Sequence, residues 1–247
     1  MTLKTKPVLI LVPVAAVLLC AGLIGSVVYH RSQKTDEKPS ASLPESSPEA
    51  FTFFNIGPTT QLTNEIQSYL KDHLGDCGVE TKTTIDLKLP DIENYAALFP
   101  RLSALNQALN YLPRQRVEHD TLRLTYRYAR EKDVPFDVIR LVFSRKQRTP
   151  LFFNLYSKRD GAEFIGSIRR KYGVPQTIGQ ENSPEHALYW RKENALLIIS
   201  IAKNRIGFNE YHFGIYYLDN IAALAEAEKR EREQAEKEKE KTGGLAF

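Results

Sequence analysis

Apolar and polar residues alternate with a period of two over several segments of the chain, and this alternation predicts β-strands. The clearest example runs from Val79 to Leu89, and Pro90 ends it. Similar alternating or short apolar runs predict about eight strands in all. These strands are expected near residues 51–56, 79–89, 122–128, 136–144, 151–156, 187–191, 196–201 and 211–217.

Apolar residues at helical spacing predict helices between these strands, near residues 62–74, 95–109 and 160–172. Thr59 or Thr60 is the expected N-cap of the first helix. Pro100 is expected in the first turn of a fresh helical segment, where proline is tolerated. Three strands between residues 120 and 156 have short connections and predict an antiparallel meander.

The whole pattern predicts an α+β domain over residues 51–220, with an antiparallel or mixed sheet and helices packed on one face of it. A repeat within this domain is a further possibility. The run Phe53 to Ile56 resembles Phe152 to Leu155, and at the same offset of 99 residues Ile66 corresponds to Ile165. Both a duplicated unit and a chance similarity are compatible with so few identities.

An uncharged apolar run of 23 residues extends from Pro7 to Tyr29. As a helix it would span roughly 35 Å, enough to cross the ~30 Å hydrocarbon core of a bilayer. A cleaved signal peptide fits less well, because this run is long and lacks a small-x-small cleavage site. A lipoprotein site would need a small residue before Cys20, and Leu19 stands there. The sequence therefore predicts a single-pass anchor that contacts the lipid bilayer through residues 7–29.

The segments around the anchor and after the domain have distinct compositions. Residues 1–6 form a short tail, and residues 30–50 form a linker rich in Ser, Pro and Glu, which is expected to be disordered. Residues 221–241 consist mainly of Glu, Lys, Arg and Ala and predict a charged helix without a coiled-coil seam. Residues 242–247 form a flexible tail. With so short an N-terminal tail, we expect the domain outside the cytoplasm, which in a bacterium is the periplasm.

The charge of the whole chain, +4, is too small to indicate a partner. From Arg114 to Lys171, however, 15 basic and 7 acidic residues give a net charge of +8. This excess predicts a basic face that binds an anionic polymer or an acidic protein surface. Solubilising charge balanced by acids elsewhere is the alternative. The residues expected on the face are Arg123, Arg127, Arg140, Arg145, Lys146 and Arg148.

No motif in the sequence predicts catalytic residues, a metal site or a cofactor. The chain has no phosphate-binding glycine loop and no paired-histidine metal motif. Asp72, His73, Asp76 and Cys77 could supply metal ligands, but a helix end followed by a glycine turn need not make them converge. Glu118-His119-Asp120 places a histidine between two acids. Neighbouring side chains of an extended chain point to opposite faces, so these three cannot all converge on one site.

These observations favour a membrane-anchored, non-enzymatic envelope protein whose domain binds another protein or an anionic envelope component. The alternative is a membrane-tethered hydrolase or metal-dependent enzyme, which requires at least two of the domain's histidines to converge with carboxylates. A third hypothesis places the basic face on anionic lipid in the cytoplasm. Nucleic acid is not an expected partner, because no stacking motif is present. The sequence gives no oligomeric state.

Overall fold

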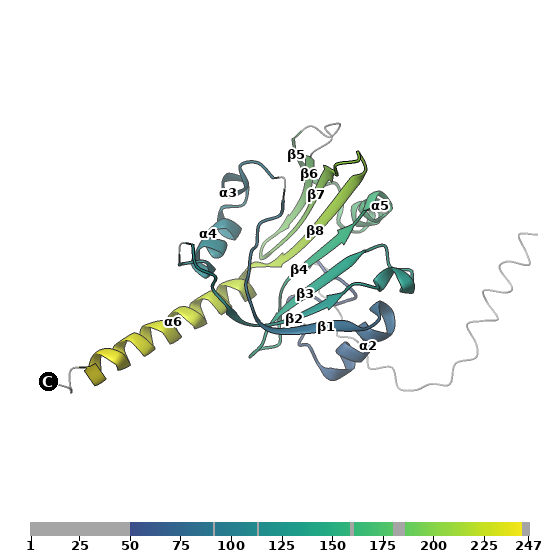
Figure 1. Ribbon diagram of the computed structural model, residues 1–247. Helices are drawn as coiled ribbons and strands as arrows, with labels where there is room; N and C mark the ends of the chain where they lie inside the picture. The colour runs from purple at the N-terminus through teal and green to yellow at the C-terminus, as the bar shows by residue number, and fades with distance from the viewer. Residues whose placement is uncertain (1–49, 91, 113, 159–160, 180–185, 244–247) are drawn as a thin grey trace, which may run out of the picture. The chain divides into compact units, whose positions relative to one another are not determined.

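A computed structural model describes residues 50–90, 92–112, 114–158, 161–179 and 186–243 (Figure 1). The chain divides into two units, residues 1–42 and 43–247, and all described residues belong to the second. The predicted anchor at residues 7–29 lies outside the described residues. Within those residues, no helix has the length and apolarity needed to cross a membrane.

Eight strands form one antiparallel sheet in the order β1-β2-β3-β4-β8-β7-β6-β5. The sheet and the accompanying helices agree with the predicted α+β class. The strands are β1 (Cys77–Thr83), β2 (His119–Tyr126), β3 (Val138–Ser144), β4 (Pro150–Ser157), β5 (Gln176–Ile178), β6 (His186–Lys192), β7 (Ala195–Lys203) and β8 (Asn209–Tyr217). The helices are α2 (Asn64–Leu74), α3 (Tyr95–Leu98), α4 (Pro100–Leu109), α5 (Gly161–Tyr172) and α6 (Leu218–Gly243), with a 3₁₀ turn at Ala129–Lys132.

The two halves of the domain have a similar order of elements, except that α3, α4 and the 3₁₀ turn lie between strands of the first half only among the described residues. Each half begins with a helix, α2 or α5, continues with an edge strand and then adds three strands toward the centre, where β4 pairs with β8. The edge strands β1 and β5 begin 99 residues apart, which is the offset seen in the sequence. The motif that suggested the repeat is not equivalent in the two halves. Residues 152–155 lie in β4, whereas residues 53–56 form a tight turn closed by an isolated bridge.

One side of the sheet, here called the first face, is covered by α2, α5 and the turn at residues 51–56. Leu124 of β2, Phe153 of β4 and Phe213 of β8 point to this side. They pack in one buried cluster with Ile66 of α2 and Ile165 of α5, the two isoleucines related by the sequence offset. Burial of this apolar surface is the main term that holds both helices to the sheet.

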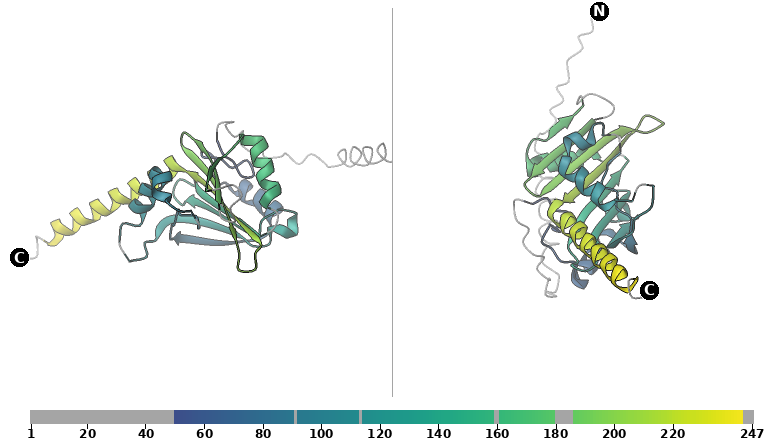
Figure 2. Two further views of the ribbon diagram at one scale, coloured as in Figure 1. Left: turned by 90° about the horizontal axis from the view of Figure 1, so that it is seen from above. Right: turned by 90° about the vertical axis from the view of Figure 1, so that its left-hand side faces the viewer.

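The opposite side, the second face, is covered in part by residues 85–89, by α3 and α4 and by the first turns of α6. Phe152, Ile198 and Tyr216 point from the sheet into this second buried cluster. Figure 2 shows α5 and α4 on opposite sides of the sheet. The prediction that helices pack on one face only is therefore wrong, because β4, β7 and β8 are apolar on both of their faces.

Two of the predicted strands also differ from the structure. Residues 51–56 fold as a buried turn and do not join the sheet. The alternating run of residues 79–89 is a strand only as far as Thr83, because its register with β2 shifts after Thr81 and Lys82 has a left-handed φ of 55°. Ile85, Leu87 and Leu89 then cross to the second face and are buried there.

The helix boundaries follow local chemistry. Thr63, not Thr59 or Thr60, caps α2, and its Oγ1 accepts a hydrogen bond from the backbone N–H of Ile66. Pro100 occupies the first turn of α4, as predicted. The charged helix extends beyond the predicted 221–241 and begins directly where β8 ends.

Gly214 in the central strand β8 provides a test of the packing on the second face. A Cβ at this position would lie 2.5 Å from Cε2 of Tyr216, whose ring is buried. We expect Gly214→Ala to lower the free energy of unfolding by about 1–3 kcal/mol through overpacking. Denaturant unfolding followed by circular dichroism measures this change.

Gly78→Ala in β1 is the matched control. The nearest atom to its Cβ would be the Thr125 carbonyl oxygen at 3.9 Å. Without a clash, this change should leave stability unaltered or raise it by about 0.5–1 kcal/mol, since alanine loses less backbone entropy than glycine. Equal destabilisation by the two variants would contradict the packing described for Tyr216.

Candidate functional site

Three of the six predicted basic residues gather on the part of the second face that α3, α4 and α6 leave uncovered. Arg123 lies in β2 and Arg140 in β3, where Arg140 pairs with Thr125. Arg123 is flanked in sequence by Leu122 and Leu124, which point to the first face. Arg123 therefore points to the second face, because side chains alternate along a strand. Arg127 follows β2 directly and is exposed.

These three residues, the arginine cluster, surround one acidic side chain. Arg123 donates a hydrogen bond of 2.5 Å to Glu80 of β1. This hydrogen bond, with the charges of all three arginines, lowers the pKa of Glu80. Desolvation, followed by the like charges of Arg123 and Arg127, lowers the pKa of Arg140. The cluster thus holds three positive charges against one negative charge.

Arg127 and Arg140 have no hydrogen-bonded acidic partner within the described residues. Three buried polar atoms nearby, Arg123 Nε, Thr125 Oγ1 and Asn154 Oδ1, have no hydrogen-bond partner among the described residues. Arg140 pairs with Thr125 on one side and with Asn154 on the other, so these three residues form one row across β2, β3 and β4. The guanidinium groups, which are donors only, suit a planar oxyanion such as a carboxylate, or a phosphate.

Aromatic rings border the row on its β4 and β8 side. Tyr156 lies two residues beyond Asn154 on β4, and its ring packs against that of His212 with 4.9 Å between the ring centres. Burial, with a hydrogen bond to Glu210, raises the pKa of Tyr156 to about 12. The hydroxyl of Tyr156 is therefore already engaged with Glu210 within the fold.

The other three predicted basic residues do not join the arginine cluster. All three lie at the turn between β3 and β4. Arg145 pairs with Asp120, and Lys146 pairs with Glu231 of α6. Arg148 donates to the carbonyl oxygen of Leu62 at 2.6 Å and so ties the turn to the segment before α2. The partners of these residues within the fold give them a structural role.

Helix α6 is held against the same turn by a buried contact. His119 is fully buried, and its Nδ1 lies 2.8 Å from Oε2 of Glu228. The other carboxylate oxygen of Glu228 accepts a hydrogen bond of 3.0 Å from the backbone N–H of Asp120. Residues 233–240 of α6 are exposed.

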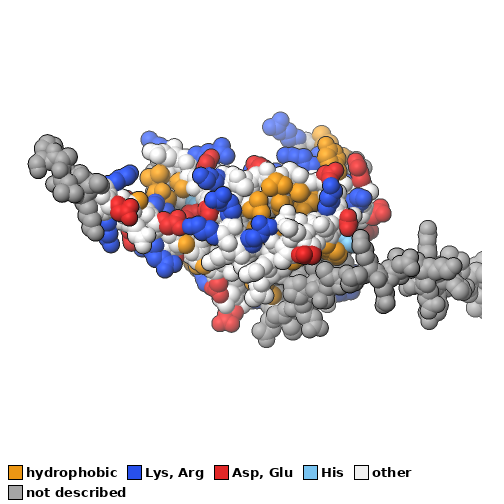
Figure 3. All heavy atoms as spheres, turned by 90° about the horizontal axis from the view of Figure 1, so that it is seen from below, with side chains coloured by type: hydrophobic (Ala, Val, Ile, Leu, Met, Phe, Trp, Pro, Cys, Tyr) orange, Lys and Arg blue, Asp and Glu red, His pale blue; other side chains and the backbone are white. Residues whose placement is uncertain are grey.

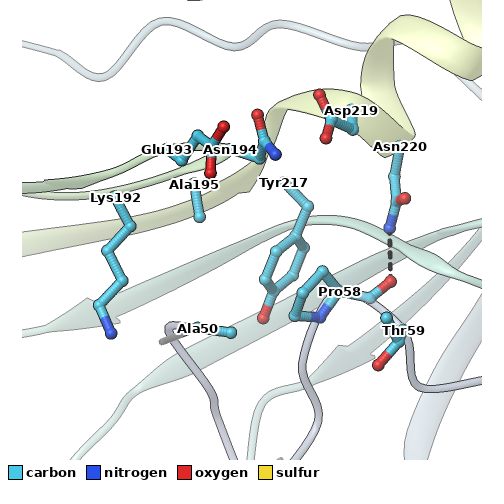
Figure 4. Close-up of a pocket in the computed structure, with 10 residues that line it drawn as sticks. All are labelled: Ala50, Pro58, Thr59, Lys192, Glu193, Asn194, Ala195, Tyr217, Asp219 and Asn220. Atoms are coloured by element: carbon cyan, nitrogen blue, oxygen red, sulfur yellow. Dashed lines mark hydrogen bonds between the residues drawn. The ribbon is translucent and has the colours of Figure 1, made fainter. Parts of the chain in front are cut away.

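A pocket of about 680 Å³ lies where the β6–β7 turn meets the start of α6 (Figure 4). Its polar groups hold the chain together. Asn220 donates to the carbonyl oxygens of Pro58 and Pro150, at 2.7 and 2.8 Å. The hydroxyl of Tyr217 lies 3.0 Å from the carbonyl oxygen of Phe51, and burial raises the pKa of Tyr217. This pocket is a weaker candidate than the arginine cluster, because these groups already have partners.

The histidines required by the enzyme hypothesis have different surroundings. His119 contacts Glu228, whereas His73 contacts the Tyr69 carbonyl oxygen. His186 pairs with Ile201 of β7, and His212 pairs with Ser200, the residue before Ile201. Because successive side chains of a strand alternate, these two histidines point to opposite faces of the sheet. Within the described part of the chain, no three His, Cys, Asp or Glu side chains are placed to hold a metal ion.

Comparisons with known proteins add no relative. No family model matches this chain, and neither curated proteins nor solved structures give a match.

The surface as a whole does not carry one sign of charge. On the side of the molecule seen in Figure 3, Lys and Arg side chains are interspersed with acidic and apolar side chains. On this side of the molecule, the basic residues do not form one continuous patch (Figure 3). Glu80, Thr125 and Asn154 were not among the predicted site residues. In the sequence, each of them is a polar residue within a predicted strand. The strand pairing adds that each has a polar neighbour on an adjacent strand.

The contact between His119 and Glu228 yields a prediction for the docking of α6. Glu228→Ala leaves a buried imidazole and a backbone N–H without an acceptor, so we expect a loss of about 1–3 kcal/mol in the free energy of unfolding. Glu231→Ala, three residues along the same helix, removes only an exposed pair with Lys146 and should cost no more than about 1 kcal/mol. Urea unfolding of both variants measures the difference. If Glu228→Ala costs no more than Glu231→Ala, the docking described here is incorrect.

Proposed function

We propose that this protein is a membrane-anchored, non-enzymatic binding protein whose domain recognises an acidic partner protein or an anionic envelope polymer. The observation that supports this proposal most strongly is the arginine cluster. Arg123, Arg127 and Arg140 surround Glu80 on an uncovered part of the sheet, and none but Arg123 has an acidic hydrogen-bond partner among the described residues.

The energetics of the site support recognition of an oxyanion. Like charges that repel one another cost free energy, and a bound carboxylate or phosphate would neutralise them. Thr125 is 7% exposed and Asn154 is half-buried, so their unpaired oxygens lie where desolvation is costly without a partner. A bound group that also donates a hydrogen bond would satisfy them.

The proposed placement is a single-pass protein of a bacterial inner membrane with the domain in the periplasm. Its support is the uncharged apolar run from Pro7 to Tyr29. The polar linker of residues 30–50 would let the domain reach a partner at some distance from the bilayer.

Replacement of the arginine cluster tests the binding function. The full chain in lipid nanodiscs is titrated with fluorescent poly-L-glutamate, and anisotropy reports binding. We expect the triple variant Arg123→Gln, Arg127→Gln, Arg140→Gln to bind at least about tenfold more weakly, which corresponds to about 1.4 kcal/mol. Added salt should weaken binding of the parent protein, since exposed charges are screened beyond about 8 Å at physiological ionic strength.

A second triple variant controls for net charge. Lys229, Arg230 and Lys237 are exposed on α6, and their replacement by glutamine removes the same three charges. This variant should bind within about twofold of the parent protein if the site, and not the net charge, is responsible. Equal losses in the two triple variants would refute the assignment of the site.

A reporter fusion tests the placement. We expect alkaline phosphatase fused after Phe247 to be active, because that enzyme needs the oxidising periplasm to form its disulfides. A fusion of the same enzyme to residues 30–247, which lack the apolar run, is the control and should be inactive. An inactive full-length fusion would favour the cytoplasmic hypothesis, in which the basic residues face anionic lipid.

A further inference from the structure

An apolar cavity of about 320 Å³ lies on the first face, on the side of the sheet opposite the arginine cluster. Helix α5 forms one wall, the turn at Phe51–Phe54 forms another, and the central strands form the floor. The lining includes Leu155, Leu197 and Ile215 on the floor, Phe164 and Ser167 on α5, and Lys171 at the end of α5.

Among the described residues, none with a charged side chain lines the interior of the cavity. Leu155, Leu197 and Ile215 are buried aliphatic side chains from three adjacent strands, and Phe164 of α5 faces them. Phe164 packs edge-on against Phe213, with 5.3 Å between the ring centres. Contact between this apolar surface and an aliphatic chain is favourable, because it removes apolar area from water. A polar ligand has no such effect.

The polar groups of the cavity gather around Tyr172. Lys171 donates to Oγ1 of Thr52 at 3.1 Å, and the backbone N–H of Thr52 donates to the hydroxyl of Tyr172. The ammonium groups of Lys171 and Lys192 lie 5.0 and 5.3 Å from the centre of the Tyr172 ring. Within the described residues, Lys171 has no acidic partner, so this end of the cavity is electropositive.

We propose that this cavity binds the single aliphatic chain of a carboxylate amphiphile, with the chain over Leu155, Leu197 and Ile215 and the carboxylate at Lys171. The volume is near the lower limit of about 300–1,000 Å³ for small-molecule pockets, which suits one chain and not a two-chain lipid. A carboxylate would supply the charge that Thr52, a neutral partner, does not give to Lys171.

This proposal goes beyond the function argued from the arginine cluster and does not depend on it. The two sites lie on opposite faces of the sheet and share no residue. Loss of one by substitution therefore leaves the other measurable.

The test uses the full chain in lipid nanodiscs and dodecanoic acid that carries a diazirine near its methyl end. Photolysis followed by peptide mass spectrometry should place the label in β7 and β8, beside Leu197 and Ile215. Unlabelled decanoate should compete roughly tenfold better than octanoate, because two more methylene groups are buried. Label found mainly outside the cavity, or competition that does not depend on chain length, would overturn the proposal.

Two substitutions on α5 separate blocking of the cavity from damage to the helix. Ser167 is exposed at the rim, and Ser167→Trp should reduce labelling at least about tenfold by filling the space. Ala162→Trp, at an exposed position of the same helix outside the cavity lining, should leave labelling within about twofold. Equal labelling of the two variants would refute the cavity as the binding site.

Lys171→Met tests the head group. The variant should lose about tenfold in labelling by the acid, since a charge-assisted hydrogen bond disappears. Labelling by the matching diazirine-dodecanol should stay within about twofold, because the alcohol carries no charge to pair with the ammonium. A loss that is equal for acid and alcohol, or no loss for either, would overturn the assignment of the carboxylate to Lys171.

Discussion

The pairing of β4 with β8 is the interaction on which the rest of the fold depends. It joins the two halves of the sheet, and both strands contribute side chains to the apolar clusters on both faces. The end of β8 also fixes the start of the domain, because the Tyr217 hydroxyl meets the carbonyl oxygens of Phe51 and Ile56. The turn at residues 51–56 thereby reaches the first face, where it becomes one wall of the apolar cavity.

Much of the secondary structure could be predicted from the sequence, because β2 alternates and α2 and α4 have clear apolar stripes. The covering of both faces was missed. Alternation of apolar and polar residues indicates a strand with one face exposed to solvent. The run from Ala195 to Ala202 is instead apolar at nearly every position, which is typical of a strand buried on both sides. The end of β1 was missed for another reason. Residues 84–89 keep the alternating pattern after they leave the sheet, and only tertiary packing distinguishes the two cases.

The candidate site was predictable in part. Arg123, Arg127 and Arg140 share a face because alternation fixes the side and strand pairing fixes the neighbours. Arg145 and Lys146 are also basic, but each of them pairs with an acidic residue of the fold. One pairs with Asp120 and the other with Glu231, which is 85 residues away in sequence on α6. Composition cannot distinguish a basic residue with such a partner from one without it, so the sequence alone could not show that only three of the six predicted residues lie together.

The edges of the sheet limit how this domain can meet another protein. At one edge, the bulge after Thr81 and the left-handed Lys82 interrupt the row of backbone groups that a foreign strand would need. At the other edge, β5 has only three residues and offers too short a template. Growth of the sheet from chain to chain is therefore disfavoured at both ends. A high local concentration of this domain should accordingly carry little risk of many copies joining into a continuous β-structure.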